Sequence, residues 1–268
     1  MTIAISVKVD DGVVLAADSA ATMSVSGQTG GSQVVNIYNN ARKVFRLHNS
    51  RPVGAIVWGA SAIGRFSIGR LVKGFRAEVG AVGDHYTIEG MAAEFRDFIR
   101  RYCPPSTGPI RPHKANLLVA GYSAKSHFPE TWEIGTGDEA EDTPRLLRAE
   151  DNPGMNFFGM PLSLERLING YDPLLAVILD QVGVTKEVKE HFLKMCEHDI
   201  PRIICQSSMP IQDAIDLARF LADTATNFTR FCWGPNSVGG PIDIAVITQY
   251  EGFNWVSRKL FFDKTLNR

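Results

Sequence analysis

Residues 2–22 have the sequence TIAISVKVDDGVVLAADSAAT. Residues 2–9 alternate in the manner of a β-strand, and residues 13–17 form a short apolar run that ends at Asp18. The Asp-Asp-Gly between them is a strong signal for a tight turn between antiparallel strands. The stretch therefore predicts a β-hairpin at the start of the chain.

Further strands and helices follow this hairpin in blocks. The polar residues 24–40 predict a long loop with at most a short strand at 34–35. Alternation and short apolar runs predict strands, and helical spacing predicts helices. The expected strands are 43–47, 53–58, 115–121, 130–135, 242–248 and 253–259, and the expected helices are 62–78, 89–102 and most of 162–229. Helices grouped between sheet segments favour an α/β (α+β) fold, a four-layer αββα sandwich, over alternating βαβ units.

The bulk composition favours an ordinary globular protein, and we expect residues 1–268 to form one domain. The chain is 44% hydrophobic and 21% charged, and its net charge of −1 gives no reason to expect nucleic acid as a partner. No apolar run is long enough to span a bilayer, and the first residues lack the features of a signal peptide. The four cysteines form no CxxC pair. We therefore expect a cytoplasmic protein with reduced thiols.

Three residues and their spacing suggest a catalytic site. Thr2 follows the initiator Met1, whose removal we expect, and a free N-terminal threonine holds both a hydroxyl nucleophile and an amine that can act as its base. Lys43 at the start of a strand would lower the pKa of both groups, and Asp18 would keep that lysine charged and oriented. Gly59 ends a strand before a helix, where its backbone N–H could stabilise an oxyanion.

Each of these residues also has an ordinary explanation when it is taken alone. A threonine after the initiator methionine is common, and an aspartate at a strand end is usually a turn or cap residue. A lysine at a strand edge is usually solvated, and a glycine before a helix is usually there for its conformation. Cys196, His198 and Cys205 lie close together in the sequence but lack the ligand set of a zinc site. No metal or organic cofactor is expected.

The combination resembles the proteasome β-subunit-like family of N-terminal nucleophile (Ntn) hydrolases. Residues 2–22 resemble the opening of these subunits, and the interval from Thr2 to Asp18 matches without a gap. The similarity resumes at ARKVFRL (41–47), AIVWG (55–59), NLLVAGY (116–122), DAIDLA (213–218) and GPIDIAVIT (240–248). Within this family, the sequence most resembles the bacterial proteasome homologues, which include the HslV-type and Anbu-type proteins.

The resemblance implies roles for particular residues. Thr2, Asp18 and Lys43 fall on the catalytic positions, Gly59 on the oxyanion glycine, and Thr22 on a substrate-binding position. Phe45 and Val57 fall on positions that shape the pocket for the residue before the cut, and they predict an apolar pocket.

The sequence also departs from the family. Ala20 stands where an arginine is usual, and Met160 rather than a serine follows Gly159. The best substitute for a serine that usually precedes the glycine pair is Ser237. An extra helical segment is expected near 170–208.

The first hypothesis is a threonine endopeptidase in homo-oligomeric stacked rings, acting on peptides or unfolded proteins with an ATP-driven unfoldase as partner. Apolar residues on helices 62–78 and 162–180 predict contacts between subunits. A non-catalytic ring scaffold and an Ntn amidase for small amides remain alternatives, because the residues around the first set of catalytic groups are altered.

Overall fold

A computed structural model describes residues 2–26, 32–79, 85–103, 114–136, 143–160, 162–198 and 204–259. These residues form two five-stranded sheets, two small hairpins and six helices, and all strand pairs are antiparallel. The predicted mixture of helices and strands is therefore confirmed. No helix among the described residues is long and apolar enough to cross a membrane.

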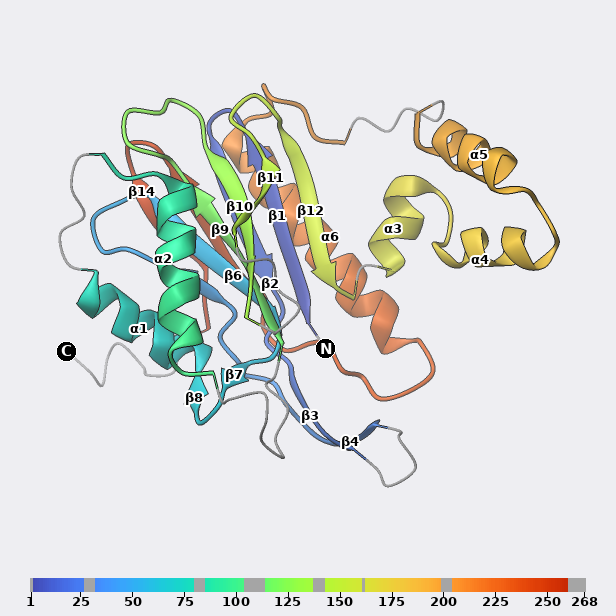
Figure 1. Cartoon of the computed structure of the whole chain (residues 1–268), viewed down its shortest axis with the longest axis horizontal. Helices are drawn as coiled ribbons and strands as arrows, with labels where there is room; N and C mark the ends of the chain where they lie inside the picture. Colours follow the sequence, from blue (N-terminus) through green and yellow to red (C-terminus); the bar gives the residue numbers. More distant parts are fainter. Residues whose placement is uncertain are drawn as a thin grey trace.

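The first sheet is built around the predicted N-terminal hairpin (Figure 1). Its strands, in spatial order, are β12 (Gly154–Gly159), β1 (Ile3–Val9), β2 (Gly12–Ala17), β13 (Asp243–Thr248) and β14 (Gly252–Ser257). Every residue of β1 and β2 is buried, including Ser6 and Lys8, which the alternating sequence would place on a polar face. Lys8 is accommodated because its ammonium donates to the carbonyl oxygens of Glu150 (2.8 Å) and Asn152 (3.3 Å).

The second sheet holds the other group of predicted strands. Its spatial order is β11 (Arg145–Arg148), β10 (Glu130–Gly135), β9 (Ala115–Gly121), β6 (Val53–Gly59) and β5 (Val44–Arg46). Because β6 runs antiparallel to both β5 and β9, Lys43 at the start of β5 and Gly59 at the end of β6 lie toward the same end of the sheet.

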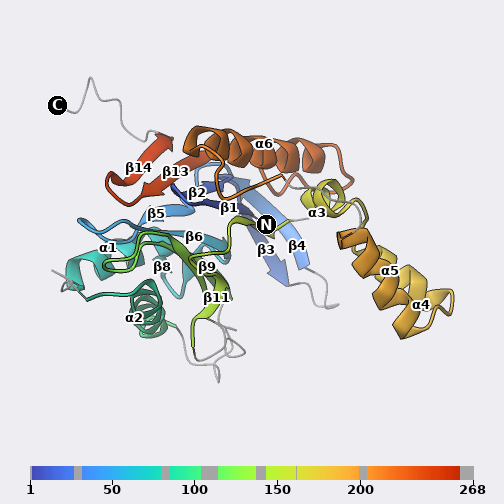
Figure 2. The ribbon, with the colours of Figure 1, turned by 90° about the horizontal axis from the view of Figure 1, so that it is seen from above.

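Some of the helices cover the outer faces of the sheets, whereas others extend away from them (Figures 1 and 2). The helices are α1 (Ile68–Glu78), α2 (Ile88–Arg100), α3 (Leu162–Asn169), α4 (Leu174–Gln181), α5 (Lys186–His198) and α6 (Ile211–Arg230). One apolar cluster joins α1 and α2 to the second sheet, a second joins α6 and α3 to the first sheet, and a third lies between the two sheets. The second and third clusters lie on opposite faces of the first sheet, and β1 and β2 are therefore buried on both faces.

Two predicted elements differ in the structure. β3 (Ala21–Ser26) and β4 (Ser32–Tyr38) pair with each other where a long loop was expected, and the short strand considered at 34–35 lies within β4. Helix α1 begins at Ile68 rather than 62, because β7 (Ala62–Ile63) and β8 (Phe66–Ser67) pair first and Ser67 then caps the helix.

Strands β11 and β12 were not predicted. β12 pairs with β1 along its whole length, so the chain gains a partner for the edge of the N-terminal hairpin. The acidic loop expected at 137–142 lies outside the described residues.

The extra segment expected near 170–208 contains α4 and α5. Both helices extend away from the sheets in two views (Figures 1 and 2). Several large apolar side chains on them are exposed, notably Leu174, Val177, Ile178, Val182 and Val188. Of the apolar residues on helices 62–78 and 162–180 that the sequence suggested for contacts between subunits, Ile68, Leu71 and Leu164 are buried within the chain, whereas Leu167 is exposed.

Candidate active site

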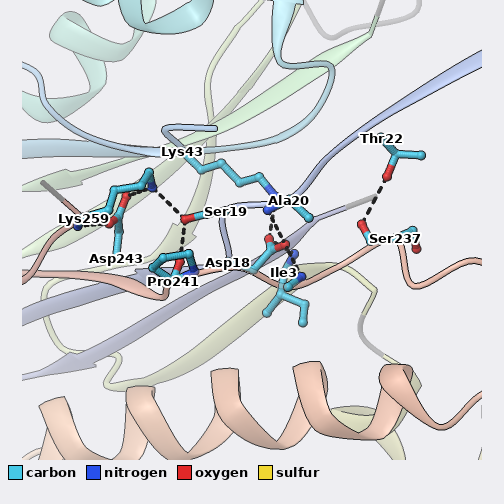
Figure 3. Close-up of polar contacts among 11 residues, drawn as sticks. Ile3, Asp18, Ser19, Ala20, Thr22, Lys43, Ser237, Pro241, Asp243 and Lys259 are labelled. Carbon is cyan, nitrogen blue, oxygen red and sulfur yellow. Dashed lines mark hydrogen bonds and ion pairs between the residues drawn. The ribbon is translucent and has the colours of Figure 1, made fainter. Parts of the chain in front are cut away.

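The Asp18 carboxylate lies at the centre of the candidate site and accepts several hydrogen bonds (Figure 3). Its Oδ1 accepts hydrogen bonds from the Ile3 N–H (2.9 Å) and from the Lys43 ammonium (2.5 Å). Its Oδ2 accepts from the backbone N–H of Ala20 (3.1 Å) and of Gly239 (3.0 Å). Four donors around one carboxylate allow the charged form to exist although the side chain is buried.

Lys43 approaches Asp18 from the second sheet, just before β5 begins. Both members of this ion pair are buried, with side-chain exposures of 4% for Lys43 and 0% for Asp18. Burial lowers the pKa of Lys43, whereas the charge of Asp18 and the hydrogen bond to it raise that pKa. Lys259 lowers the pKa of Lys43 slightly further. The ammonium is therefore a positive charge held in a low-dielectric environment, where it acts strongly on nearby groups.

Thr2 is connected to this pair through the backbone. The backbone N–H of Ile3, the residue after Thr2, donates to the same Asp18 oxygen as Lys43. The Lys43 ammonium therefore lies beside the peptide group that follows Thr2. Gly159 packs against Thr2 from β12: a Cβ at Gly159 would lie 2.0 Å from the Thr2 carbonyl oxygen, and its φ is +90°. Only glycine fits there without moving Thr2.

Gly59 ends β6 with a φ of +81°, and a Cβ there would lie 2.6 Å from the Lys114 carbonyl oxygen. The glycine is therefore required by the backbone as it leaves the sheet. Its role as an oxyanion donor stays a prediction.

Thr22 and Ser237 lie together at the start of β3. The Thr22 hydroxyl donates to the Ser237 carbonyl oxygen (3.2 Å), which ties β3 to the segment that also supplies the Gly239 N–H to Asp18. The Ser237 side chain is fully buried, and its hydroxyl has no hydrogen-bond partner among the described residues. A buried hydroxyl without a partner costs stability, so this one invites a functional explanation.

Phe45 and Val57 are both buried, with exposures of 3% and 2%, in the cluster beneath α1 and α2. Phe45 also borders an open pocket, whereas Val57 is packed inside the core. Their predicted part in substrate binding remains a prediction.

A second buried ion pair next to the first was missed by the sequence analysis. The Lys259 ammonium binds Asp243 and donates to the Ser19 hydroxyl (2.7 Å), and that hydroxyl donates to the Pro241 carbonyl oxygen (2.5 Å) (Figure 3). Asp243 lies within the string GPIDIAVIT that carried part of the resemblance, but its partner is far away in sequence. Through its hydrogen bond to Ser19, Lys259 holds the residue that follows Asp18 in place.

Metal ligands are not gathered in the part of the chain that the structure describes: no group of three or more His, Cys, Asp or Glu side chains there could hold an ion. The Cys205 thiol is instead half-buried and contacts the Lys8 carbonyl oxygen (3.6 Å). Burial raises the pKa of this thiol.

Comparison with known proteins supports the same fold. The chain is similar to a solved structure of an Anbu (Gly-1) mutant from Hyphomicrobium sp. strain MC1, with a TM-score of 0.51 and 17% sequence identity. The match covers 99% of this chain and 90% of that chain. Neither the family models nor the curated proteins give a match. At this level of identity the likeness shows the fold alone, so the chain shares its fold with that Anbu structure.

Proposed function

We propose that the chain is a threonine-type peptidase that uses Thr2 as its N-terminal nucleophile after removal of Met1. The observation that supports this most directly is the shared Asp18 oxygen, which binds both the Lys43 ammonium and the Ile3 N–H. This arrangement holds a buried positive charge beside the nucleophile's own peptide group. Such a charge favours an alkoxide and a neutral amine, which are the forms that the reaction needs.

The reaction follows from these positions. The Thr2 hydroxyl attacks the substrate carbonyl carbon while its proton passes to the Thr2 amine, and the Gly59 N–H stabilises the oxyanion of the tetrahedral intermediate. The C–N bond then breaks, and the protonated amine gives its proton to the leaving amino group. Water hydrolyses the resulting ester by the same route, which releases the acid and restores Thr2.

The proposal includes a particular architecture and assembly. The three apolar clusters are what a four-layer αββα sandwich in one domain requires. We propose that copies of the chain form stacked rings in the cytoplasm, with the exposed apolar side chains of α4 and α5 at contacts between copies. An ATP-driven unfoldase would then deliver unfolded proteins. Light scattering that finds only monomer at micromolar concentration would remove the ring from the proposal.

The experiment compares Thr2→Ala with Thr226→Ala on a set of fluorogenic peptides. Thr226 lies on α6, and its hydroxyl has no hydrogen-bond partner among the described residues, so its removal should leave activity unchanged. Thr2→Ala should abolish hydrolysis while thermal stability and oligomeric state stay close to those of the parent. Intact mass of the untagged chain checks in parallel that Met1 is removed. Hydrolysis by Thr2→Ala at the parent rate would refute the proposal.

A second candidate is a ring scaffold without turnover. It is favoured by Met160, whose side chain packs against the core at the position where the family has a serine. Retention of Met1 in the cellular protein, together with no hydrolysis of any peptide or small amide, would favour the scaffold. Hydrolysis of small amides alone would favour an amidase.

A further inference from the structure

Two adjoining pockets lie between the segment that leads into Lys43 and helix α1. The first has a volume of about 520 Å³, and it is bordered by Asn40, Ala41 and Arg42 on one side and by Ser61 and Ala62 on another. Residues 40–42 immediately precede Lys43, and Ser61 follows Gly59 by two positions. The Ala41 N–H donates to the carbonyl oxygen of Ser19 (2.8 Å), the residue after Asp18. Two of the segments that line the pocket, 40–42 and 61–62, therefore adjoin the candidate site along the chain.

The lining of both pockets is strongly basic. The first pocket includes Arg42, Arg70 and Lys73. The second, of about 410 Å³, shares Arg42, Gly69 and Lys73 with the first and adds Arg46, Arg76, Arg258 and Lys259. Among the described residues that line either pocket there is no aspartate or glutamate. Seven cationic side chains therefore line the two adjoining pockets, which together we call the basic depression, and such a concentration of positive charge attracts anions.

Several of these cations lower the pKa of one another, although Lys259 is paired with Asp243. Burial lowers the pKa of Arg76, and the neighbouring Arg46 lowers it further. Burial is also the main cause of the lowered pKa of Arg42; Arg258 and Arg76 lower that pKa further, whereas Asp243 raises it. The Arg76 Nε is buried and has no hydrogen-bond partner among the described residues. A buried guanidinium nitrogen without an acceptor is a costly feature that an anionic ligand would relieve.

We propose that this depression binds a carboxylate side chain of the substrate, so that the chain cleaves peptides after glutamate or aspartate. The inference rests on the proposed function. When a substrate carbonyl lies at the Gly59 N–H, the nearest side chain is that of the residue whose carbonyl is attacked. The first pocket begins two residues after Gly59, so it receives that side chain. The apolar pocket predicted from Phe45 and Val57 is replaced in this proposal, because Val57 packs in the core and Phe45, which borders the second pocket, lies there beside cationic side chains.

The first test measures turnover by the parent chain. Four fluorogenic peptides should differ only in the residue before the cleaved bond, which is Glu, Gln, Leu or Lys. The Glu peptide should have the highest kcat/KM, about tenfold or more above the Gln peptide, because a charged hydrogen bond is stronger than a neutral one. Fastest cleavage after Leu or Lys would overturn the proposal.

Charge reversal on helix α1 tests the pocket itself. Lys73 is exposed and borders both pockets, so Lys73→Glu should reverse or abolish the preference for Glu over Gln without affecting folding. The matched control is Arg219→Glu on α6, which is also exposed and changes the net charge by the same amount. An unchanged preference in Lys73→Glu, or an equal loss in Arg219→Glu, would overturn the proposal.

A binding measurement separates this proposal from the proposed function. Fluorescein-labelled Glu and Gln peptides are titrated onto the Thr2→Ala chain, which needs no turnover, with inorganic phosphate as a competitor. Tighter binding of the Glu peptide, lost in Thr2→Ala with Lys73→Glu, supports the pocket even if no peptide is hydrolysed. Equal binding of both peptides, or a site that binds phosphate but shows no preference for Glu, refutes it.

Discussion

The Lys43 ammonium lies 2.5 Å from Asp18 Oδ1, and this buried ion pair joins the two sheets at the end where the N-terminal hairpin begins. Asp18 follows β2 in the first sheet, and Lys43 precedes β5 in the second. Neither side chain can be replaced without affecting both the position of the other and the backbone next to Thr2. Substitutions at Asp18 or Lys43 should therefore change both the free energy of unfolding and the rate of hydrolysis.

Removing the Lys43 charge should eliminate turnover. Lys43→Ala should lower kcat by about 10²–10³, the cost of losing a preorganised electrostatic group. It should also destabilise the fold by about 3 kcal/mol, because a buried carboxylate loses its cation. Lys43→Arg should be equally inactive but more stable than Lys43→Ala, since a planar guanidinium keeps the charge but does not fit a site for a compact ammonium.

Peptide hydrolysis and thermal denaturation of the two variants check this prediction. Arg219→Ala is a suitable control, because Arg219 is exposed on α6 and lies outside both the ion pair and the two basic pockets. Normal hydrolysis by Lys43→Ala would exclude Lys43 from the catalytic set.

The lowered pKa of Lys43 predicts how stability depends on pH. The folded chain loses the Lys43 proton at a lower pH than the unfolded chain, where the pKa is about 10.4. Between these two values the unfolded chain binds more protons, so the free energy of unfolding rises with pH. Lys8, whose pKa is lowered mainly by burial, contributes in the same direction.

Lys43→Met should reduce this slope by up to about 1.4 kcal/mol per pH unit, the limit for one titrating group. Urea denaturation of the parent and of Lys43→Met from neutral pH to pH 10 measures both slopes. Identical slopes would show that Lys43 titrates alike in the folded and unfolded chains.

The sequence placed Asp18 and Lys43 near each other because each residue lies at the end of a strand with a clear hydrophobic pattern. Asp18 terminates an apolar run and Lys43 starts an alternating one, so the strand boundaries located both correctly. Lys259 and Asp243 could not be paired in the same way, because their contact depends on how β13 and β14 meet the segment around Ser19. That is a tertiary relationship without a local signal.

The β3–β4 hairpin was expected only as a loop with at most a short strand at 34–35. Its strands lie in a stretch rich in Ser, Gly, Gln and Asn, whose composition is typical of loops, and they pair only with each other. The basic pockets were missed for a related reason. Arg42, Arg70 and Arg258 are ordinary surface charges in the sequence, and only the packing of β5, α1 and β14 brings their segments together.

Asp18→Asn should destabilise the fold more than a loss of one charge suggests. Each carboxylate oxygen accepts two hydrogen bonds, and an amide offers only one acceptor oxygen. Either orientation of the amide leaves two donors without an acceptor, at about 1–3 kcal/mol each. Chemical denaturation should therefore show a larger loss than for Asp213→Asn, an exposed first-turn residue of α6. Equal losses would contradict the four-donor arrangement.

Ser237→Ala separates a functional hydroxyl from a structural one. The Ser237 hydroxyl has no partner among the described residues, so its removal should change the free energy of unfolding by less than about 1 kcal/mol. The Thr22 bond is to the Ser237 backbone and should persist. If the hydroxyl acts on the Thr2 amine, kcat should still fall by about tenfold or more, in the range of proton-transfer groups. Unchanged kcat together with unchanged stability would leave Ser237 outside the site.

The contact between Gly159 and Thr2 predicts that a single methyl group at Gly159 displaces the nucleophile. Gly159→Ala adds a Cβ 2.0 Å from the Thr2 carbonyl oxygen at a φ of +90°, so β12 and β1 must move apart where they pair.

Gly252→Ala is the matched control. Gly252 also has a positive φ, +72°, in the first sheet, but nothing lies within 4 Å of its added Cβ. The control should lose only the cost of a left-handed alanine, about 1–2 kcal/mol, and keep its activity. Gly159→Ala should lose more stability than the control and, because a displacement of about 1 Å can cost on the order of 10²-fold in rate, most of its kcat. Denaturation curves and peptide hydrolysis for both variants provide the comparison. Equal activity in the two alanine variants would show that the Gly159 contact does not position Thr2.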